Sequence, residues 1–376
     1  MAKKKADKTF TQKEYKAALD QVIRLCSCAL KNEAPAKEFL EVIDYSLLYN
    51  VSEMHMLSAL IGYALKLAGV NKTPFIQAEA KAIRKLGLMD AEMSVIFSKM
   101  EEEGIWYLPL KGTLLKDYYP SYGLRQMSDH DILFDAKRAN DVKNIMVGLG
   151  YTVKLFDKYH HDSYHKEPVC NFEMHRMLFS KSYNEAFYNY YSDIKSRLVK
   201  NEGSNFGYHF TPEDFYVYMV AHEYKHFSAD GTGLRSLVDT YVYLKHFNLN
   251  MDYVEKEINK LGISEFEKSN RNLSLHLFDT GKLNAEEYKM LLYIFNSGTY
   301  GNIKNKVEKD VKEMGRWKYF KSRLFTTKEI MLNDFPILRK LPFLYPVFFI
   351  IRLFRGLFFR REKFMAQLKG AIKGKV

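Results

Sequence analysis

Three short apolar runs in the middle of the chain restrict its fold more than any other feature. "IWYLPLKG" (105–112) ends in a glycine, as a buried strand does before a tight turn. "DHDILF" (129–134) and "VCNFEMHRML" (169–178) are similar runs, and "YTVKLF" (151–156) adds a fourth. Since apolar runs of this length are typical of strands, the sequence predicts a small β-sheet between about residues 105 and 180.

Helical periodicity precedes and follows this region. "KEYKAALDQVIRLCSCAL" and "TPEDFYVYMVAHEYKHF" place apolar residues three and four positions apart. Thr211 is suited to cap the second of these helices, with Pro212 at its first position. We therefore predict an α+β fold with four regions. These are an N-terminal helical region (1–95), an α+β core (96–182), a C-terminal helical domain (183–334) and a basic, aromatic, amphipathic tail (335–376).

Composition limits the partners and the compartment. The formal net charge of the 376 residues is +12, which favours anionic partners such as nucleotides, nucleic acid or an acidic membrane surface. Three cysteines cannot form a disulfide framework. The basic segment Met1–Lys8 is not followed by an apolar stretch of the signal-peptide type. We therefore expect a cytoplasmic protein.

The tail suggests an anionic membrane surface as a partner. In "LPFLYPVFFIIRLFRGLFFRREKF" (341–364), the longest apolar stretch, Leu341–Ile351, is shorter than the roughly 20 residues that span a bilayer. A basic segment rich in aromatic residues is what an interfacial anchor requires. The alternative is a C-terminal helix that packs on the body with its arginines in solvent. The first reading places the protein peripherally at the inner face of the membrane.

Two of the predicted strands carry acidic residues. Asp129 and Asp131 are two residues apart at the start of a strand, so their carboxylates share a face. Aligned carboxylates are suited to holding Mg²⁺ against nucleotide phosphates. A third acid, Glu173, lies between apolar neighbours in a later strand, and His175 shares its face. Alone, the D-x-D pattern is weak evidence, but the third acid strengthens it.

A turn upstream of these acids can hold phosphate. Lys111, Gly112 and Thr113 join the first strand to a helix, whose free N–H groups can bind an anion. Arg125 can supply a fixed guanidinium for a triphosphate.

The stretch "LPLKGTLLKDYYPSYGLRQMSDHDILF" (108–134), with "GLGY" behind it, resembles a bacterial family of uncharacterised nucleotidyltransferases. The family belongs to the superfamily that includes DNA polymerase β, and the resemblance covers about residues 95–245. The positions that match its motifs are Lys111, Gly112, Arg125, Asp129, Asp131, Glu173 and His175. Two departures are Thr113, where serine or glycine is usual, and His130, where an apolar residue is common.

The resemblance implies a small mixed nucleotidyltransferase sheet with flanking helices. It also implies transfer of NMP from an NTP to an acceptor with the help of Mg²⁺ or Mn²⁺. Asp129 and Asp131 would bind the metal, and Glu173 would complete the metal site or act as general base. The acceptor is unidentified. A small molecule, a glycan intermediate or a protein is favoured over RNA, because the chain has no recognised RNA-binding module.

A second motif suggests different chemistry. His222-Glu223-x-x-His226 has the spacing by which a helix presents two zinc ligands and a general base. Lys225 places a cation between the two histidines, and Asp239 is the only nearby candidate for the third ligand that a catalytic zinc site needs. A zinc hydrolase is therefore the less favoured alternative.

The family resemblance assigns the same helix another role. In the family, such a helix carries a lysine before the second histidine, followed by an arginine and an aspartate one turn apart. Here these are Lys225, His226, Arg235 and Asp239, and the last two can pair as i and i+4. We expect His222 and His226 to line the substrate cleft or to pack in the core.

The sequence supports two further expectations. The histidines at positions 160, 161 and 165 are expected in a solvated loop. A nucleotide-binding adaptor without catalytic activity, located at the membrane, stays open beside the enzyme.

Overall fold

The computed structural model describes residues 12–229, 231–299 and 328–359, and, between the last two ranges, residues 311, 315, 317–319 and 321. The basic segment Met1–Lys8 and the end of the predicted tail, from residue 360 onward, lie outside these described residues.

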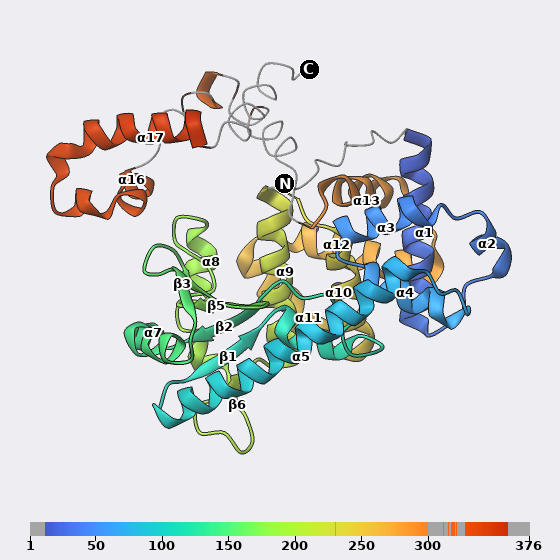
Figure 1. The fold of residues 1–376 in the computed structure, drawn as a ribbon, viewed down its shortest axis with the longest axis horizontal. Helices are drawn as coiled ribbons and strands as arrows, with labels where there is room; N and C mark the ends of the chain where they lie inside the picture. The colour runs from blue at the N-terminus through green and yellow to red at the C-terminus, as the bar shows by residue number, and fades with distance from the viewer. Residues whose placement is uncertain are drawn as a thin grey trace.

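The N-terminal part is helical, as predicted. Its helices are α1 (Gln12–Lys31), α2 (Lys37–Glu41), α3 (Tyr45–Met54), α4 (Ser58–Leu67) and α5 (Thr73–Glu102). The first four share one apolar core with helices from much later in the chain, which contribute Leu237, Leu273 and Ile294. The long α5 runs from this core to the sheet (Figure 1), so that Phe75 belongs to the helical core and Met100 to the core of the sheet.

A mixed five-stranded sheet follows, and it confirms the predicted α+β class. Its strands are β1 (Tyr107–Leu110), β2 (His130–Phe134), β3 (Thr152–Leu155), β4 (His161–Lys166) and β5 (Cys170–His175). They lie in the order β1-β2-β5-β4-β3, and only the pair β2–β5 is parallel. Strand β4 was not predicted from the sequence, because its residues are mostly polar.

Alternation along β2 and β5 gives the two faces of the sheet different roles. Ile132 and Phe172 point to one face, where they pack with α5 and α7 (Ala139–Gly148). Leu133 belongs to a second core that contains residues of α9 (Pro212–Ala229). Asp131 has the same parity as Leu133, so the acidic face of the sheet is turned towards α9.

The connections and the C-terminal helices complete the part of the fold that surrounds the site. They are α6 (Gly112–Leu115), η1 (Lys116–Tyr118), η2 (Ala136–Arg138), α8 (Glu185–Tyr190), η3 (Ile194–Arg197), β6 (Val199–Lys200), β7 (Tyr208–His209), α10 (Leu234–His246), α11 (Met251–Leu261), α12 (Ser264–Leu275), a π-helical turn (His276–Thr280) and α13 (Ala285–Ser297). The small strands β6 and β7 pair with each other.

The described part of the tail forms α16 (Lys328–Asp334), η5 (Pro336–Arg339), η6 (Pro342–Leu344) and α17 (Tyr345–Phe359). These elements pack around their own small apolar cluster, which includes Met331, Phe335 and Leu338. In the described part of the chain, no helix combines the length and the apolarity needed to cross a bilayer.

Candidate active site

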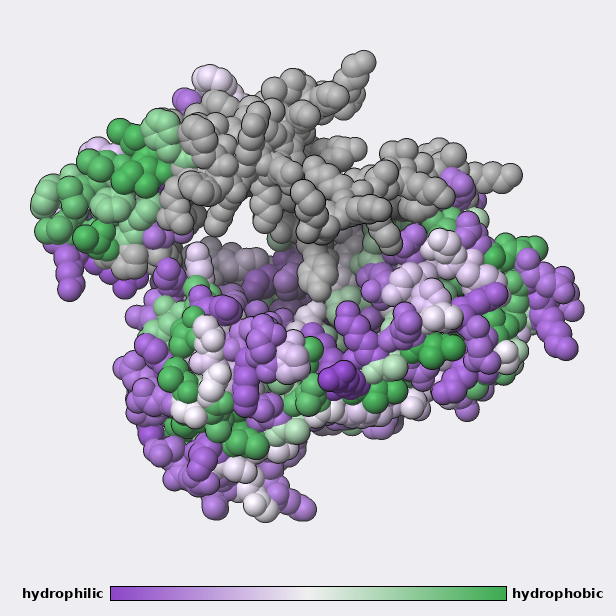
Figure 2. All heavy atoms as spheres, in the orientation of Figure 1, coloured by the Kyte–Doolittle hydropathy of each residue, from purple (hydrophilic) through white to green (hydrophobic). Residues whose placement is uncertain are grey.

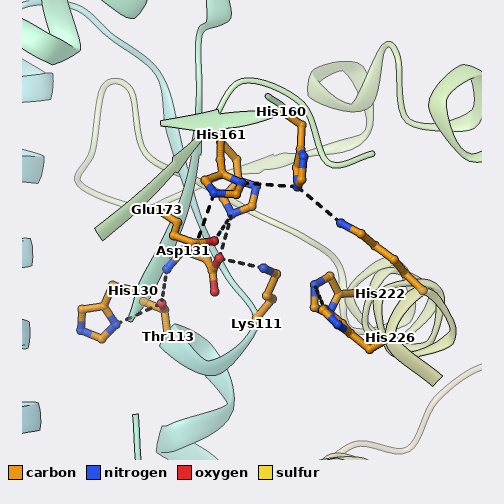
Figure 3. Close-up of polar contacts among 11 residues, drawn as sticks. Lys111, Thr113, His130, Asp131, His160, His161, Glu173, His222 and His226 are labelled. Atoms are coloured by element: carbon orange, nitrogen blue, oxygen red, sulfur yellow. Dashed lines mark hydrogen bonds and ion pairs between the residues drawn. The ribbon is translucent and has the colours of Figure 1, made fainter. Parts of the chain in front are cut away.

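Three carboxylates meet beside the start of β2, where it pairs with β5. In the parallel pairing of these strands Asp131 lies directly opposite Glu173, and Asp129 immediately precedes β2. All three line one cavity of about 310 Å³. The register of the two strands brings Asp131 and Glu173 together (Figure 3), and Asp129 lines the same cavity, as the sequence predicts.

Lys111 and His175 hold the central carboxylate. Lys111 Nζ and His175 Nε2 each lie 2.7 Å from Asp131 Oδ1. Lys111 has a φ of 48°, a left-handed conformation that is uncommon for a residue with a side chain. This turn between β1 and α6 directs the lysine towards β2. Strained backbone of this kind is often found at functional sites.

Burial and neighbouring charges shift the pKa values of the three acids in different directions. Burial alone would raise the pKa of Asp131, but the Lys111 ammonium and the hydrogen bond from His175 outweigh it and hold that pKa below its usual range. Burial and the neighbouring Asp131 raise the pKa of Asp129. Burial, Asp131 and Asp129 raise the pKa of Glu173 to about 7. The acids therefore repel one another, and a cation between them would relieve that repulsion.

Gly112 is needed because a guanidinium lies against it. A Cβ at this position would be 2.2 Å from Arg125 Nη1. Arg125 Nε and Nη2 each donate to the Asp239 carboxylate at 2.8 Å, and the arginine side chain is only 7% exposed. Asp239 therefore fixes the Arg125 guanidinium beside the cavity, and its expected contact with a triphosphate stays a prediction. The position of the Arg125 side chain also supports the turn at Gly112.

Arg235 and Asp239, which the sequence places one turn apart as a possible pair, have other partners in the structure. Asp239 accepts hydrogen bonds from Arg125 and, at 2.8 Å, from Tyr119 Oη. Arg235 Nη1 instead donates to the Gln126 carbonyl oxygen at 2.8 Å. Arg235 lines the cavity and lies close enough to Asp129 for the two charges to interact. Arg235 and Arg125 therefore both lie near the charge of Asp129.

Thr113 and His130, the two departures from the family pattern, contact each other. Thr113 Oγ1 lies 3.2 Å from His130 Nδ1 and accepts from the Asp131 N–H at 3.3 Å. His130 Nε2 lies 3.1 Å from Asp90 Oδ1 on α5. His130 points away from the acids because it is the middle residue of D-x-D, and it is fully buried. Together these side chains fix α6 and α5 to β2.

Helix α9 lines the cavity with the two histidines of the HExxH motif. His222 Nε2 and His226 Nε2 are 3.2 Å apart, and both side chains line the cavity. Glu223 also lines the cavity, and its carboxylate accepts hydrogen bonds from Thr240 and Asn270, on α10 and α12. Within the described residues, no group of three metal-ligating side chains includes either histidine. The structure therefore supports a wall of the cleft rather than a zinc site.

The expectation of a solvated histidine loop is wrong. His161 and His165 lie in β4, and β4 pairs with β5 so that His161 is directly opposite His175. His161 Nε2 lies 3.7 Å from Glu173 Oε1, and His161 Nδ1 lies 3.4 Å from His160 Nε2. Burial and the nearby Lys225 lower the pKa of His160 to about 2. The signal that could have predicted this strand is that His161, Ser163 and His165 occupy every second position, as residues on one face of a strand do.

Lys225 completes this histidine group from α9. Its Nζ lies 3.4 Å from His160 Nε2. Burial and the Lys111 ammonium lower the pKa of Lys225 to about 8. The lysine between the two motif histidines therefore faces the acids and the β4 histidines.

The structure thus brings most of the sequence-predicted residues to one place. The predicted residues that line the cavity are Lys111, Gly112, Arg125, Asp129, Asp131, Glu173, His222, His226, Arg235 and Asp239. Thr113 and His175 are buried beside the cavity, in contact with His130 and Asp131. Lys225 is not among the residues that line the cavity; its Nζ lies beside His160, which is next to His161.

Comparison with known proteins agrees with this geometry. The profile of a family described as uncharacterised nucleotidyltransferases matches residues 41–279, more than half of the chain. No curated protein and no solved structure matches the sequence. The matched range contains the sheet, the acids and the cavity-lining helices α9 and α10. The chain belongs to this family of nucleotidyltransferases.

Proposed function

We propose that the protein transfers NMP from an NTP to an acceptor in the cavity lined by the Lys111–Gly112 turn, β2, β5, α9 and α10. Membership of the family supports nucleotidyl transfer in general. The observation that supports this site is the convergence of Asp129, Asp131 and Glu173 in one cavity beside the Lys111–Gly112 turn.

The donor atoms fit a hard divalent cation. Mg²⁺ is held by carboxylate oxygens together with substrate phosphates. Three carboxylates meet here, and burial together with repulsion from neighbouring acids raises the pKa values of Asp129 and Glu173. Asp129, Asp131 and Glu173 would hold Mg²⁺ or Mn²⁺. The metal would supply positive charge to the phosphates and polarise the acceptor hydroxyl.

The chain's own residues would orient the reactants. Lys111 lies where its ammonium can neutralise phosphate charge, and Arg235 offers a second cation across the cavity. The acceptor oxygen attacks the α-phosphorus in line, the bond to pyrophosphate breaks, and Glu173 or water takes the hydroxyl proton. Arg125 keeps the turn in place through its contact with Gly112.

A thermal-shift screen tests this proposal. The unfolding temperature of the purified protein is measured with each NTP, with and without Mg²⁺. We expect stabilisation that requires both, because only the folded site binds the complex. Asp131→Asn should abolish it, whereas Asp252→Asn, an exposed acid on α11, should not. Equal stabilisation of wild type and Asp131→Asn would refute the proposal.

A second proposal concerns the location of the enzyme. Phe343, Val347, Ile350 and Phe354 form an exposed apolar stripe that includes one face of α17, visible as a green patch in Figure 2. Basic residues follow in the sequence to residue 376. Such a segment fits adsorption to an anionic membrane surface, which would place the protein peripherally at the cytoplasmic face.

Sedimentation with vesicles of anionic and of neutral lipid tests this location. Val347→Asp/Ile350→Asp should abolish binding to the anionic vesicles and leave the melting temperature unchanged. Deletion of residues 336–376 should also abolish binding, and retained binding by either variant would refute the proposal.

A further inference from the structure

Lys225 is a half-buried cation that lacks an acidic partner among the described residues. Its Nζ lies 3.4 Å from Nε2 of the His160 ring and 5.7 Å from the centroid of the Tyr183 ring. Glu173 and Asp131 act on it through their charge and form no ion pair with it. Partial burial of an ammonium without a paired counter-charge carries a desolvation cost, which an anionic ligand would offset. The site therefore contains a positive charge that the protein alone does not neutralise.

The order of the strands places this charge on one side of the reacting atoms. The turn at Lys111 follows β1, the paired acids lie at β2, Glu173 lies in β5 and His161 in β4. The sheet has these strands in the order β1-β2-β5-β4. Figure 3 shows His160 and His161 on one side of Asp131, and Thr113 on the other. Lys225 therefore lies across the acids from the α6 end of the site.

In-line transfer requires the entering and leaving oxygens to lie on opposite sides of the α-phosphorus. If the β- and γ-phosphates occupy the turn at Lys111, pyrophosphate leaves towards β1. The acceptor hydroxyl then approaches from the side of β5 and β4. His160, His161 and Lys225 are the residues that it meets there.

A metal ion is a less suitable occupant of the histidine group. His160, His161 and His175 have ligand atoms close enough to bind one ion. However, the Lys225 ammonium lies beside His160 Nε2, one of the nitrogens in this group, and would repel a bound cation. The same ammonium attracts an anion.

We propose that Lys225, with His160 and His161, binds an anionic group of the acceptor, so that the acceptor is a hydroxyl compound carrying a phosphate or a carboxylate near its nucleophile. This inference rests on the proposed function. Transfer forms the bond from the acceptor oxygen to the α-phosphorus, breaks the bond to pyrophosphate and releases the hydroxyl proton. The anionic group of the acceptor stays unchanged and orients its hydroxyl.

Titration with inorganic phosphate tests the acceptor site. The protein is first saturated with Mg²⁺ and an NTP analogue that has a methylene bridge between the α- and β-phosphorus, and binding of phosphate is then measured by calorimetry. Wild type should bind phosphate. Lys225→Gln should weaken binding by about tenfold or more, because a charge-assisted hydrogen bond is lost. Lys225→Arg should retain most of it, and Lys256→Gln, an exposed lysine on α11, should match wild type.

His160→Ala is measured in parallel and should also weaken phosphate binding, so the test does not depend on the folding of one variant. Equal phosphate affinity in wild type and both variants would overturn the proposal. Competition of phosphate with the nucleotide would also overturn it, since Lys225 would then belong to the triphosphate site. Binding of the nucleotide without binding of phosphate refutes the acceptor assignment alone. Failure of wild type to bind the Mg²⁺–nucleotide complex refutes the proposed function, and the acceptor assignment with it.

Discussion

Replacing Asp239 with asparagine should lower the free energy of unfolding by about 3–5 kcal/mol, because it leaves the buried Arg125 guanidinium without its counter-charge. A loss of this size is expected because both hydrogen bonds from Arg125 to Asp239 are 2.8 Å long. The side chains of Arg125 and Asp239 are only 7% and 11% exposed. An exposed ion pair would contribute about 1 kcal/mol or less. Tyr119 donates to the same carboxylate, so its hydrogen bond also weakens.

Urea denaturation followed by circular dichroism measures this change. Arg125→Met, Asp239→Asn and the double variant form a cycle in which the double variant should lose less than the sum of the single losses, by about 1–3 kcal/mol. Lys245, which pairs with Asp279 and is 49% exposed, gives the control variant Lys245→Gln, with a loss below about 1 kcal/mol. A loss below about 1 kcal/mol in Asp239→Asn would refute the view that this pair holds the turn at Gly112.

Three further predictions each concern a single residue. Gly112→Ala should weaken binding of the Mg²⁺–NTP complex in calorimetry, since the new Cβ would displace Arg125; unchanged affinity would contradict this. Burial lowers the pKa of His55 from 6.5 to about 4, so the unfolded state binds more protons between these values. Stability should rise by at most about 3 kcal/mol from pH 4 to 6.5, and His55→Gln should flatten the rise in denaturation curves. Burial raises the pKa of Glu223 from 4.5 to about 7, so the unfolded state releases its proton first and stability should fall across this window as pH rises. Glu223→Gln should melt above wild type at pH 8, and a lower melting temperature would contradict the assignment.

The strands that carry the acids were predictable because their side chains alternate. Apolar residues flank Glu173, and Asp131 stands two positions from Asp129, so both strands could be found and given a functional face. The pairing of Asp131 opposite Glu173 depends on a parallel register between segments about forty residues apart. Local pattern does not determine such a register.

The sequence-based expectations for Asp239 and His161 differ from the structure for a common physical reason. Arg125 and Asp239 are 114 positions apart, whereas Arg235 and Asp239 are separated by one helical turn, so local spacing favoured Arg235 as the partner. His161 was assigned to a loop because β4 is polar, and pairing with β5 makes it a strand. The division of the chain at residues 95, 182 and 334 stays a prediction, and α5 continues through the first of these boundaries.

Release of pyrophosphate by wild type and Asp131→Asn tests the central claim most directly. Purified protein is incubated with each NTP, Mg²⁺ and a small-molecule cell extract as the source of acceptor, and pyrophosphate is quantified. Wild type and Asp252→Asn should release it only when Mg²⁺ is present. Asp131→Asn should be slower by about 100-fold or more, since it removes a carboxylate at the centre of the site. Equal release by Asp131→Asn would contradict catalysis at this site, and Mg²⁺-dependent nucleotide binding without release by wild type would favour the non-catalytic adaptor.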